Sequence, residues 1–151
     1  MKLIHEVRAV KSKAELANIV KAQRISERVL HLTLLKLKSG VTEVEIANFI
    51  KKSFIKYGAP ILSFPPIVAF GKNSANIHHE PGKSKLKEGD MVMLDFGCTV
   101  NHYCSDMTRT YFFGEPNAKQ KKVYKAVLEA HNKAFEKLQA GERRAWVIDK
   151  T

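Results

Sequence analysis

Apolar residues recur at helical spacing in three long stretches of the chain. These stretches are residues 12–39, 42–58 and 117–139, and residues 143–151 resemble the opening turns of another helix. Ser12 with Glu15, and Thr42 with Glu45, have the spacing of an N-terminal capping box, in which each side chain satisfies the other residue's backbone N–H. Asn117 is the expected N-cap of the third stretch, and a glycine ends each stretch, as expected at helix C-termini: Gly40, Gly58 and Gly141. The pattern predicts three amphipathic helices.

Between the second and third helices the pattern changes to that of loop and strand. Residues 59–89 hold four of the five prolines and predict a loop with one short strand near Ile67–Phe70. Met91–Cys98 and Tyr103–Phe113 are β-prone and predict a hairpin. The order helix, helix, hairpin, helix indicates an α+β fold in which an antiparallel sheet is covered by helices. We expect one domain over residues 1–151.

Composition favours an ordinary globular protein. The chain has 151 residues, of which 44% are hydrophobic and 27% charged, and this excludes a disordered or collagen-like chain. No apolar run approaches the roughly 18–20 residues of a membrane span, and the N-terminus lacks a secretory signal. Two cysteines six residues apart make no disulfide framework. We therefore expect a cytoplasmic protein with no membrane partner.

The positive charge lies at the two ends of the chain. The net charge of +11 divides into +7 over residues 1–60, −1 over residues 61–116 and +5 over residues 117–151. Lysines alternate there with apolar residues at helical spacing, which is typical of solvated helix faces. No aromatic residues interleave with the basic ones as a base-stacking surface requires. A nucleic-acid partner is therefore not favoured.

The stretch MVMLDFGCTVNHYCSDMTRTYFF places one aspartate in each predicted strand of the hairpin. If the strands pair across a four-residue loop, Thr99–His102, then Cys98 faces Tyr103. Asp95 then stands directly opposite Asp106, with Cβ atoms about 5 Å apart. Two carboxylates at that distance repel each other unless a cation or a shared proton neutralises them. The alternative is a different register in which both aspartates face solvent.

Oxygen ligands favour hard or borderline divalent cations such as Mn, Mg or Co over a thiolate-type zinc site. Two carboxylates are too few for a tight site, so further ligands must come from elsewhere. His78 and His79 lie in the loop GKNSANIHHEPG, and neighbours in an extended segment point in opposite directions, so at most one enters a site. The alternative is a polar surface loop. The helical histidines are interpreted as solvated; these are His5, His31 and His131.

These motifs together resemble a known family. The pattern DFG-(x7)-SD-x-TRT, following NSANIHHEPG and LKEGD, is similar to the metallopeptidases of the methionine aminopeptidase, Xaa-Pro aminopeptidase and prolidase group, which have the pita-bread fold. SDMTRT, the tyrosine before it and the G-E-P after the strand favour the Xaa-Pro aminopeptidase and prolidase branch. The segments R-x-x-K-S-x-x-E-L and GVTEVEIA resemble that branch too. The resemblance covers nearly all of the chain and implies the N-terminal half of a pita-bread catalytic domain.

The resemblance also implies roles for five residues. Asp95 would bind one metal ion and Asp106 would bridge two, while His78 would be the catalytic histidine that stabilises the tetrahedral intermediate. His79, where the family often has a tyrosine or another residue, and Tyr103 are candidates for substrate binding. The implied cofactors are two divalent ions, with Mn favoured and Co or Zn as alternatives. The implied substrate is a peptide with proline at its second position.

The sequence departs from the family in two places. His102 occupies a position that is commonly glycine. The family's other three ligands, one histidine and two glutamates, lie in the second half of the fold, whereas this sequence stops at Thr151. We therefore expect the 151-residue chain to be inactive by itself, with an exposed sheet edge that a second copy could cover to form a homodimer.

Two functions are consistent with these observations. The first is a metal-dependent aminopeptidase that removes the residue preceding proline. The alternative is a non-catalytic pita-bread binding module for protein or nucleic acid, which the charge of +11 fits. Asp95, Asp106 and His78 favour the enzyme, because a binding module has no need of opposed carboxylates.

Overall fold

The computed structural model of the chain describes residues 2–138 and divides into two compact units, Met1–Glu115 and Pro116–Thr151. The expectation of one domain over residues 1–151 stays a prediction. The predicted turns over residues 143–151 lie outside the described part. Across residues 2–138 no helix has both the length and the apolar character needed to span a membrane.

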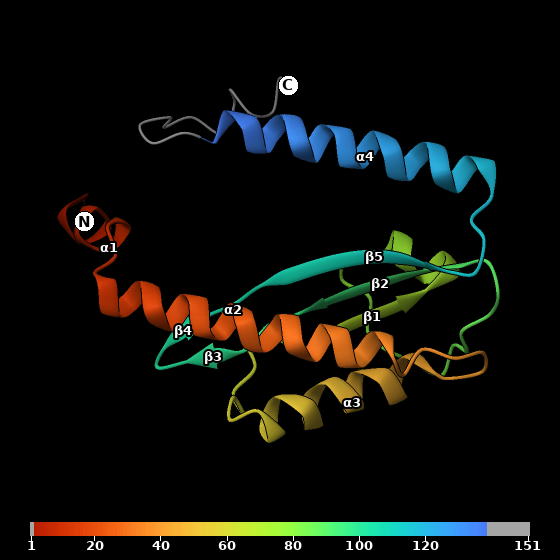
Figure 1. Cartoon of the computed structure of the whole chain (residues 1–151), viewed down its shortest axis with the longest axis horizontal. Coiled ribbons are helices and arrows are strands. Elements are labelled where there is room, and N and C mark those ends of the chain that lie inside the picture. Colours follow the sequence, from red (N-terminus) through yellow and green to blue (C-terminus); the bar gives the residue numbers. More distant parts are fainter. Residues whose placement is uncertain (1, 139–151) are drawn as a thin grey trace. The chain divides into compact units, whose positions relative to one another are not determined.

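The first unit contains three α-helices and a small antiparallel sheet (Figure 1). The helices are α1 (Lys2–Ala9), α2 (Lys13–Leu34) and α3 (Glu43–Lys56), and η1 (Gly71–Ala75) is a 3-10 turn. The strands are β1 (Ile67–Phe70), β2 (Asp90–Phe96), β3 (Thr99–Val100), β4 (Tyr103–Cys104) and β5 (Met107–Phe113). The α+β class and the strand at Ile67–Phe70 are confirmed. The short helix α1 was not predicted.

Both predicted capping boxes form, at Ser12 with Glu15 and at Thr42 with Glu45. Helix α2, which corresponds to the predicted stretch 12–39, ends at Leu34 instead of reaching residue 39. Leu37 packs against the core from the turn that follows, so an apolar position that continues the helical period belongs to a loop. Periodicity alone could not distinguish a continuing helix from a turn, because in either case the side chain of Leu37 points toward the core.

The three longer strands form one sheet in the order β1-β2-β5, with both pairs antiparallel. The predicted register is wrong. Asp95 pairs with Thr108 and not with Asp106. At the hairpin tip Thr99 pairs with Cys104, so Cys98 does not face Tyr103.

The error comes from the length of the turn. Thr99 and Val100 belong to strand β3, which leaves a two-residue turn in which Asn101 (φ 46°) and His102 (φ 70°) are both left-handed. Two successive left-handed residues make the tight turn that suits the twist of a hairpin. A backbone of this kind favours glycine, yet His102 adopts it here.

Shortening the loop moves every pair by two residues, and an even shift keeps each side chain on its own face of the sheet. Asp106 directly precedes β5, and extending the register by one residue places it on the face of Asp95 as a diagonal neighbour, with Cβ atoms somewhat less than about 7–8 Å apart. The prediction that the two aspartates share a face survives the wrong register.

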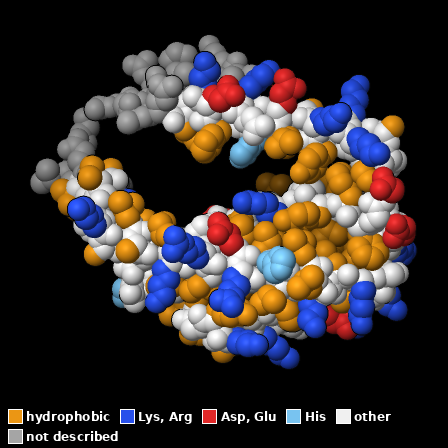
Figure 2. Space-filling model, viewed as in Figure 1, with side chains coloured by type: hydrophobic (Ala, Val, Ile, Leu, Met, Phe, Trp, Pro, Cys, Tyr) orange, Lys and Arg blue, Asp and Glu red, His pale blue; other side chains and the backbone are white. Residues whose placement is uncertain are grey.

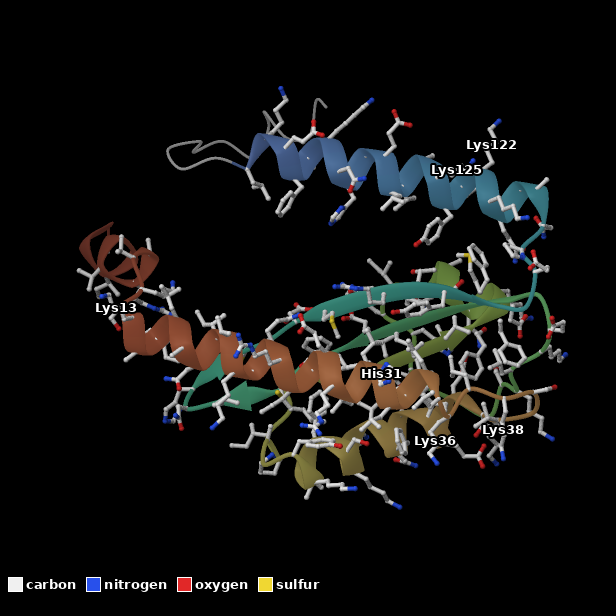
Figure 3. The ribbon with its side chains drawn as sticks, viewed as in Figure 1. Lys13, His31, Lys36, Lys38, Lys122 and Lys125 are labelled. Carbon is white, nitrogen blue, oxygen red and sulfur yellow. The ribbon has the colours of Figure 1, made fainter. Side chains whose placement is uncertain are left out.

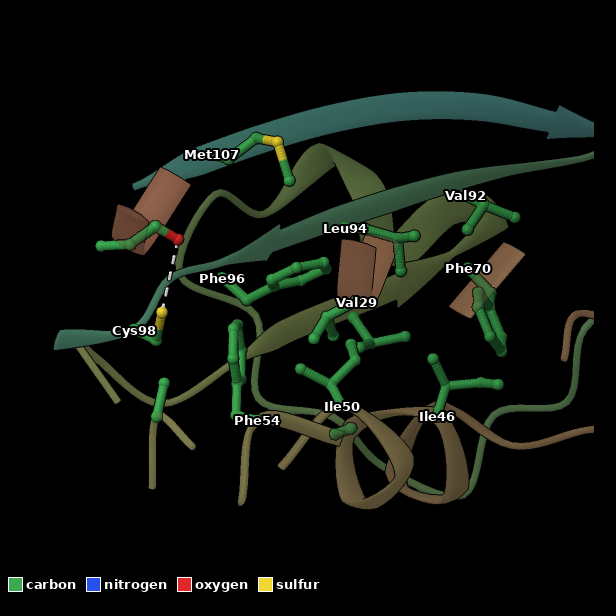
Figure 4. Packing of buried hydrophobic residues seen from close by; sticks show 14 of the residues in the cluster. Val29, Ile46, Ile50, Phe54, Phe70, Val92, Leu94, Phe96, Cys98 and Met107 are labelled. Atoms are coloured by element: carbon green, nitrogen blue, oxygen red, sulfur yellow. Dashed lines mark hydrogen bonds between the residues drawn. The ribbon is translucent and has the colours of Figure 1, made fainter. Parts of the chain in front are cut away.

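The opposite face of the sheet packs on α2 and α3. Alternate residues of β2, namely Val92, Leu94 and Phe96, are fully buried there. They meet the apolar faces of the two helices, whose contributions are Ala22, Val29, Ile46, Ile50 and Phe54 (Figure 4). Phe54 and Phe96 pack edge to face with ring centroids 5.8 Å apart. Because Val92, Leu94 and Phe96 of β2 face the helices, Asp95 lies on the opposite face of the sheet.

Basic side chains on the face seen in Figure 2 lie scattered among other residues and form no continuous stripe. His31 on α2 is exposed, as are Lys36 and Lys38 beyond that helix's C-terminal end (Figure 3). This distribution fits the expectation of solvated helix surfaces.

The second unit consists, in its described part, of helix α4 (Ala118–Lys137), which begins at the predicted N-cap Asn117. Asn117 and Gln120 form a reciprocal capping box. Its apolar positions Val123, Val127 and Phe135 are exposed.

Candidate metal centre

Asp95 lies on the sheet face that points away from α2 and α3. The residues beside it on that face are Ile67 of β1 and Thr108 of β5. The carboxylate is half-buried and its Oδ1 atom is fully enclosed. Among the described residues, Asp95 Oδ1 is the buried side-chain oxygen that has no hydrogen-bond partner. An orphaned buried carboxylate oxygen is costly unless a cation or a donor meets it.

The pKa of Asp95 also shows that its charged carboxylate is poorly stabilised in the folded chain. Burial raises the pKa of its carboxyl above 3.8, the Thr108 hydroxyl works in the opposite direction, and the charge of Asp106 raises it further. The pKa shift means that the folded chain disfavours the ionised form of Asp95. A cation between the two carboxylates would remove this penalty.

Asp106 follows a segment of backbone that is held firmly. Ser105 is buried, and its Oγ lies 2.8 Å from Ser26 Oγ and accepts a 3.0 Å bond from Cys98 N–H. The carbonyl of Ser105 accepts a 2.7 Å bond from Ser63 Oγ. Gly97 runs so close beneath that an added Cβ would lie 1.9 Å from this carbonyl. This close approach of Gly97 to Ser105, here called the Ser105 crossing, requires glycine at position 97 and fixes the backbone immediately before Asp106.

The two histidines occupy different surroundings. Residues 76–79 form a turn closed by a 3.1 Å bond from His79 N–H to the Asn76 carbonyl. The His78 N–H donates to Asn76 Oδ1 at 3.0 Å, and His78 itself is exposed. His79 turns inward, where its Nε2 lies 2.8 Å from Glu43 Oε2. His78 is therefore open to solvent, whereas His79 is engaged within the protein.

Glu43, at the first position of α3, organises this loop and was missed in the sequence. Its fully buried carboxylate accepts bonds from Phe70 N–H (2.8 Å), Asn73 Nδ2 (2.8 Å) and Gly82 N–H (3.0 Å), in addition to its contact with His79. Burial acts to raise the pKa of Glu43, but the hydrogen bonds, led by that of His79, outweigh it and lower the pKa below 4.5. Its only sequence signal was an acidic residue in a first helical turn, which the exposed Glu45 shares.

The described residues contain no complete set of metal ligands. Nowhere in residues 2–138 do three or more His, Cys, Asp or Glu side chains gather closely enough to hold an ion. His78 and His79 are therefore not ligands in common with Asp95 and Asp106. The unpaired carboxylate oxygen and the adjacent negative charge nevertheless fit a hard divalent cation, for which this chain offers two oxygen donors.

A family profile described as "Metallopeptidase family M24" matches residues 17–151. The chain belongs to this family. The prolidase from Thermococcus sibiricus, at 40% identity and a TM-score of 0.90, is covered over 40% of its length by 97% of this M24 chain. The X-Pro aminopeptidase from Thermotoga maritima, at 36% identity and a TM-score of 0.84, is covered over 38% of its length by 89% of the chain.

Among curated proteins, an uncharacterized peptidase of Staphylococcus aureus is 39% identical over 138 residues, which are 91% of this M24 chain and 39% of that protein. The chain thus spans about two fifths of the length of the relatives it matches. The resemblance to the Xaa-Pro aminopeptidase and prolidase branch is confirmed, and so is the pita-bread fold class.

Tyr103, a candidate for substrate binding, is engaged inside this M24 chain. Its hydroxyl donates to the carboxylate of Glu15 in the capping box of α2, which ties the β3–β4 hairpin to that helix. Asn101 Nδ2 adds a 3.0 Å bond to Asn18 Oδ1 on the same helix. Direct contact of Tyr103 with a substrate stays a prediction.

We expect Tyr103→Phe to change the titration of Glu15. The Tyr103 hydroxyl is the largest cause that lowers the pKa of Glu15 from 4.5 to about 2, followed by bonds from Ser12. Without the hydroxyl, the pKa of Glu15 should rise toward 4.5 but stay below it, because Ser12 remains. Carboxyl-carbon NMR across acidic pH measures this, with Glu45 as an unaffected internal control. An unchanged midpoint for Glu15 would contradict the contact.

Proposed function

We propose that the protein to which this chain belongs is a metal-dependent peptidase that hydrolyses Xaa-Pro peptides. The observation that carries the proposal is the half-buried Asp95 carboxylate, whose Oδ1 has no partner and whose neighbour on the same sheet face is Asp106. Membership of family M24 and the similarity to prolidases and an X-Pro aminopeptidase support it.

In this proposal Asp95 and Asp106 are metal ligands. Thr108 orients Asp95 through its hydroxyl, and the Ser105 crossing holds the backbone of Asp106. Two divalent cations, of which manganese is favoured and cobalt or zinc are alternatives, would supply a water acidified enough to attack a peptide carbonyl. The remaining ligands must come from outside the described residues.

His78 is the proposed catalytic histidine. It is exposed at the tip of a turn and can donate a hydrogen bond to the oxygen on which charge develops during peptide hydrolysis. His79 holds that turn through Glu43, so we propose that it positions His78; contact between His79 and substrate remains a prediction. The proposed location is cytoplasmic, and a homodimer remains a hypothesis.

The test compares the complete product of the gene with the 151-residue chain. After chelation of metal, the complete product should lose hydrolysis of Xaa-Pro dipeptides and longer Xaa-Pro peptides, and added Mn²⁺ should restore it. The same peptides with alanine in place of proline are the specificity control. We expect no hydrolysis by the 151-residue chain alone. Chelator-resistant hydrolysis would contradict metal dependence, and a metal-loaded complete product without activity would favour the binding module.

A further inference from the structure

A cavity of about 270 Å³ lies away from Asp95, between the η1 turn and the segment that leads into β2. Three of the residues that line it are lysines, Lys72, Lys85 and Lys87, and one is an aspartate, Asp90. Its volume is slightly below the range usual for drug-sized ligands, so the cavity suits a small ion or a small part of a larger molecule.

The lysines are not neutralised at close range. Within residues 2–138 no carboxylate lies within ion-pair distance of Lys72, Lys85 or Lys87. Lys85 acts on Glu45 at longer range, as one of the smaller causes that lower the pKa of that carboxyl. The lysines therefore leave a concentration of positive charge at the cavity that a bound anion would offset.

The single acidic group of the cavity is already in use. Asp90 Oδ2 accepts a 2.9 Å bond from the Lys87 N–H, and Asp90 N–H donates to the Lys87 carbonyl at 3.1 Å. Asp90 Oδ1 sits against Gly71, where an added Cβ would lie 2.6 Å away. Asp90 thus closes the turn beneath the cavity and leaves a net charge of +2 on its lining.

The walls of the cavity are held in place. Asn73 Nδ2 donates both to the buried Glu43 (2.8 Å) and to Ser84 Oγ (3.0 Å). The segment that carries Lys85 is paired with the start of α3, since Glu43 N–H donates to the Ser84 carbonyl at 3.1 Å. Lys85 and Lys87 are two residues apart with the buried Leu86 between them, so they project to one side.

We propose that this cavity is a binding site for a phosphate group, as inorganic phosphate or on a small phosphorylated metabolite. Three ammonium groups match the doubly charged oxyanion, because each is a compact point charge with several donors. Ser84 Oγ accepts from Asn73, which leaves its own hydroxyl proton available to the ligand. The fixed walls reduce the entropy lost on binding.

The test is a calorimetric titration of the protein with inorganic phosphate at physiological ionic strength, where long-range attraction by the net charge of +11 is screened. We expect saturable binding of one phosphate per chain. The double variant Lys85→Ala/Lys87→Ala should weaken it by about tenfold or more. The matched control is Lys51→Ala/Lys52→Ala, which removes the same charge from exposed positions of α3 and should leave the affinity unchanged.

Two further arms separate the alternatives. Acetate should bind much more weakly than phosphate, and equal affinity would replace the phosphate assignment with a carboxylate site. A phosphate titration of Ser84→Ala should show weaker binding, while its thermal unfolding reports whether the fold is intact. Equal weakening in both lysine variants, or no saturable binding to the unmodified protein, would overturn the proposal.

Discussion

Asp95→Asn and Asp106→Asn are each expected to lower the Xaa-Pro hydrolysis of the complete protein by at least about a thousandfold. Asparagine keeps the size of the side chain but removes the negative charge that a divalent cation requires. For Asp95 the change removes the half-buried carboxylate with the orphaned oxygen; for Asp106 it removes the second charge beside it. Initial rates at saturating Mn²⁺, with bound metal measured by mass spectrometry, test the prediction.

Asp90→Asn is the matched control, because Asp90 lies on the same strand but binds the Lys87 N–H. It should keep full activity. If Asp95→Asn also kept activity while its metal content was unchanged, the proposed centre would be wrong.

A second measurement on Asp95→Asn separates loss of function from loss of structure. The pKa of Asp95 is raised in the folded state, so the folded chain binds more protons than the unfolded chain above pH 3.8, and stability falls as pH rises through the folded-state pKa. At neutral pH without metal, Asp95→Asn should therefore be more stable than the unmodified chain. Urea unfolding of both chains in chelator, at acidic and neutral pH, measures the difference. A less stable variant would contradict the argument.

Glu43→Ala is expected to cost about 3–5 kcal/mol of unfolding free energy, a large share of what a small domain has. The substitution removes one buried carboxylate and leaves four donors around it without their acceptor. Glu45→Ala, two positions along the same helix, loses only an exposed capping contact and should cost about 1 kcal/mol. Urea unfolding of the two variants tests the difference, and equal losses would mean that the Glu43 network does not stabilise the fold.

The charge of Glu43 has a pH signature of its own. Its pKa is lowered in the folded state, so its contribution to stability is complete above pH 4.5 and is lost as pH falls through the folded-state pKa. Glu43→Gln, which keeps the shape but cannot ionise, should be less stable at neutral pH and should lose less stability on acidification. A curve parallel to that of the unmodified chain would contradict this assignment.

Features that depend only on neighbouring residues could be predicted from the sequence. The capping boxes at Ser12 and Thr42, and the cap at Asn117, formed as predicted because a cap requires only a side chain and the backbone three residues away. The shared face of Asp95 and Asp106 also followed from the sequence, since strand alternation survives an even change of register.

Features that depend on contacts between residues distant in sequence could not be predicted in this way. The left-handed backbone at His102 shortened the turn and set Thr108 opposite Asp95. The histidine side chain does not predict that backbone conformation. Glu43 and Glu45 both lie in the first turn of α3. Four donors from residues 70–82 surround the carboxylate of Glu43, whereas Glu45 is exposed to solvent. Burial of a charge depends on which segments fold over it, and the local pattern of residues does not predict those segments.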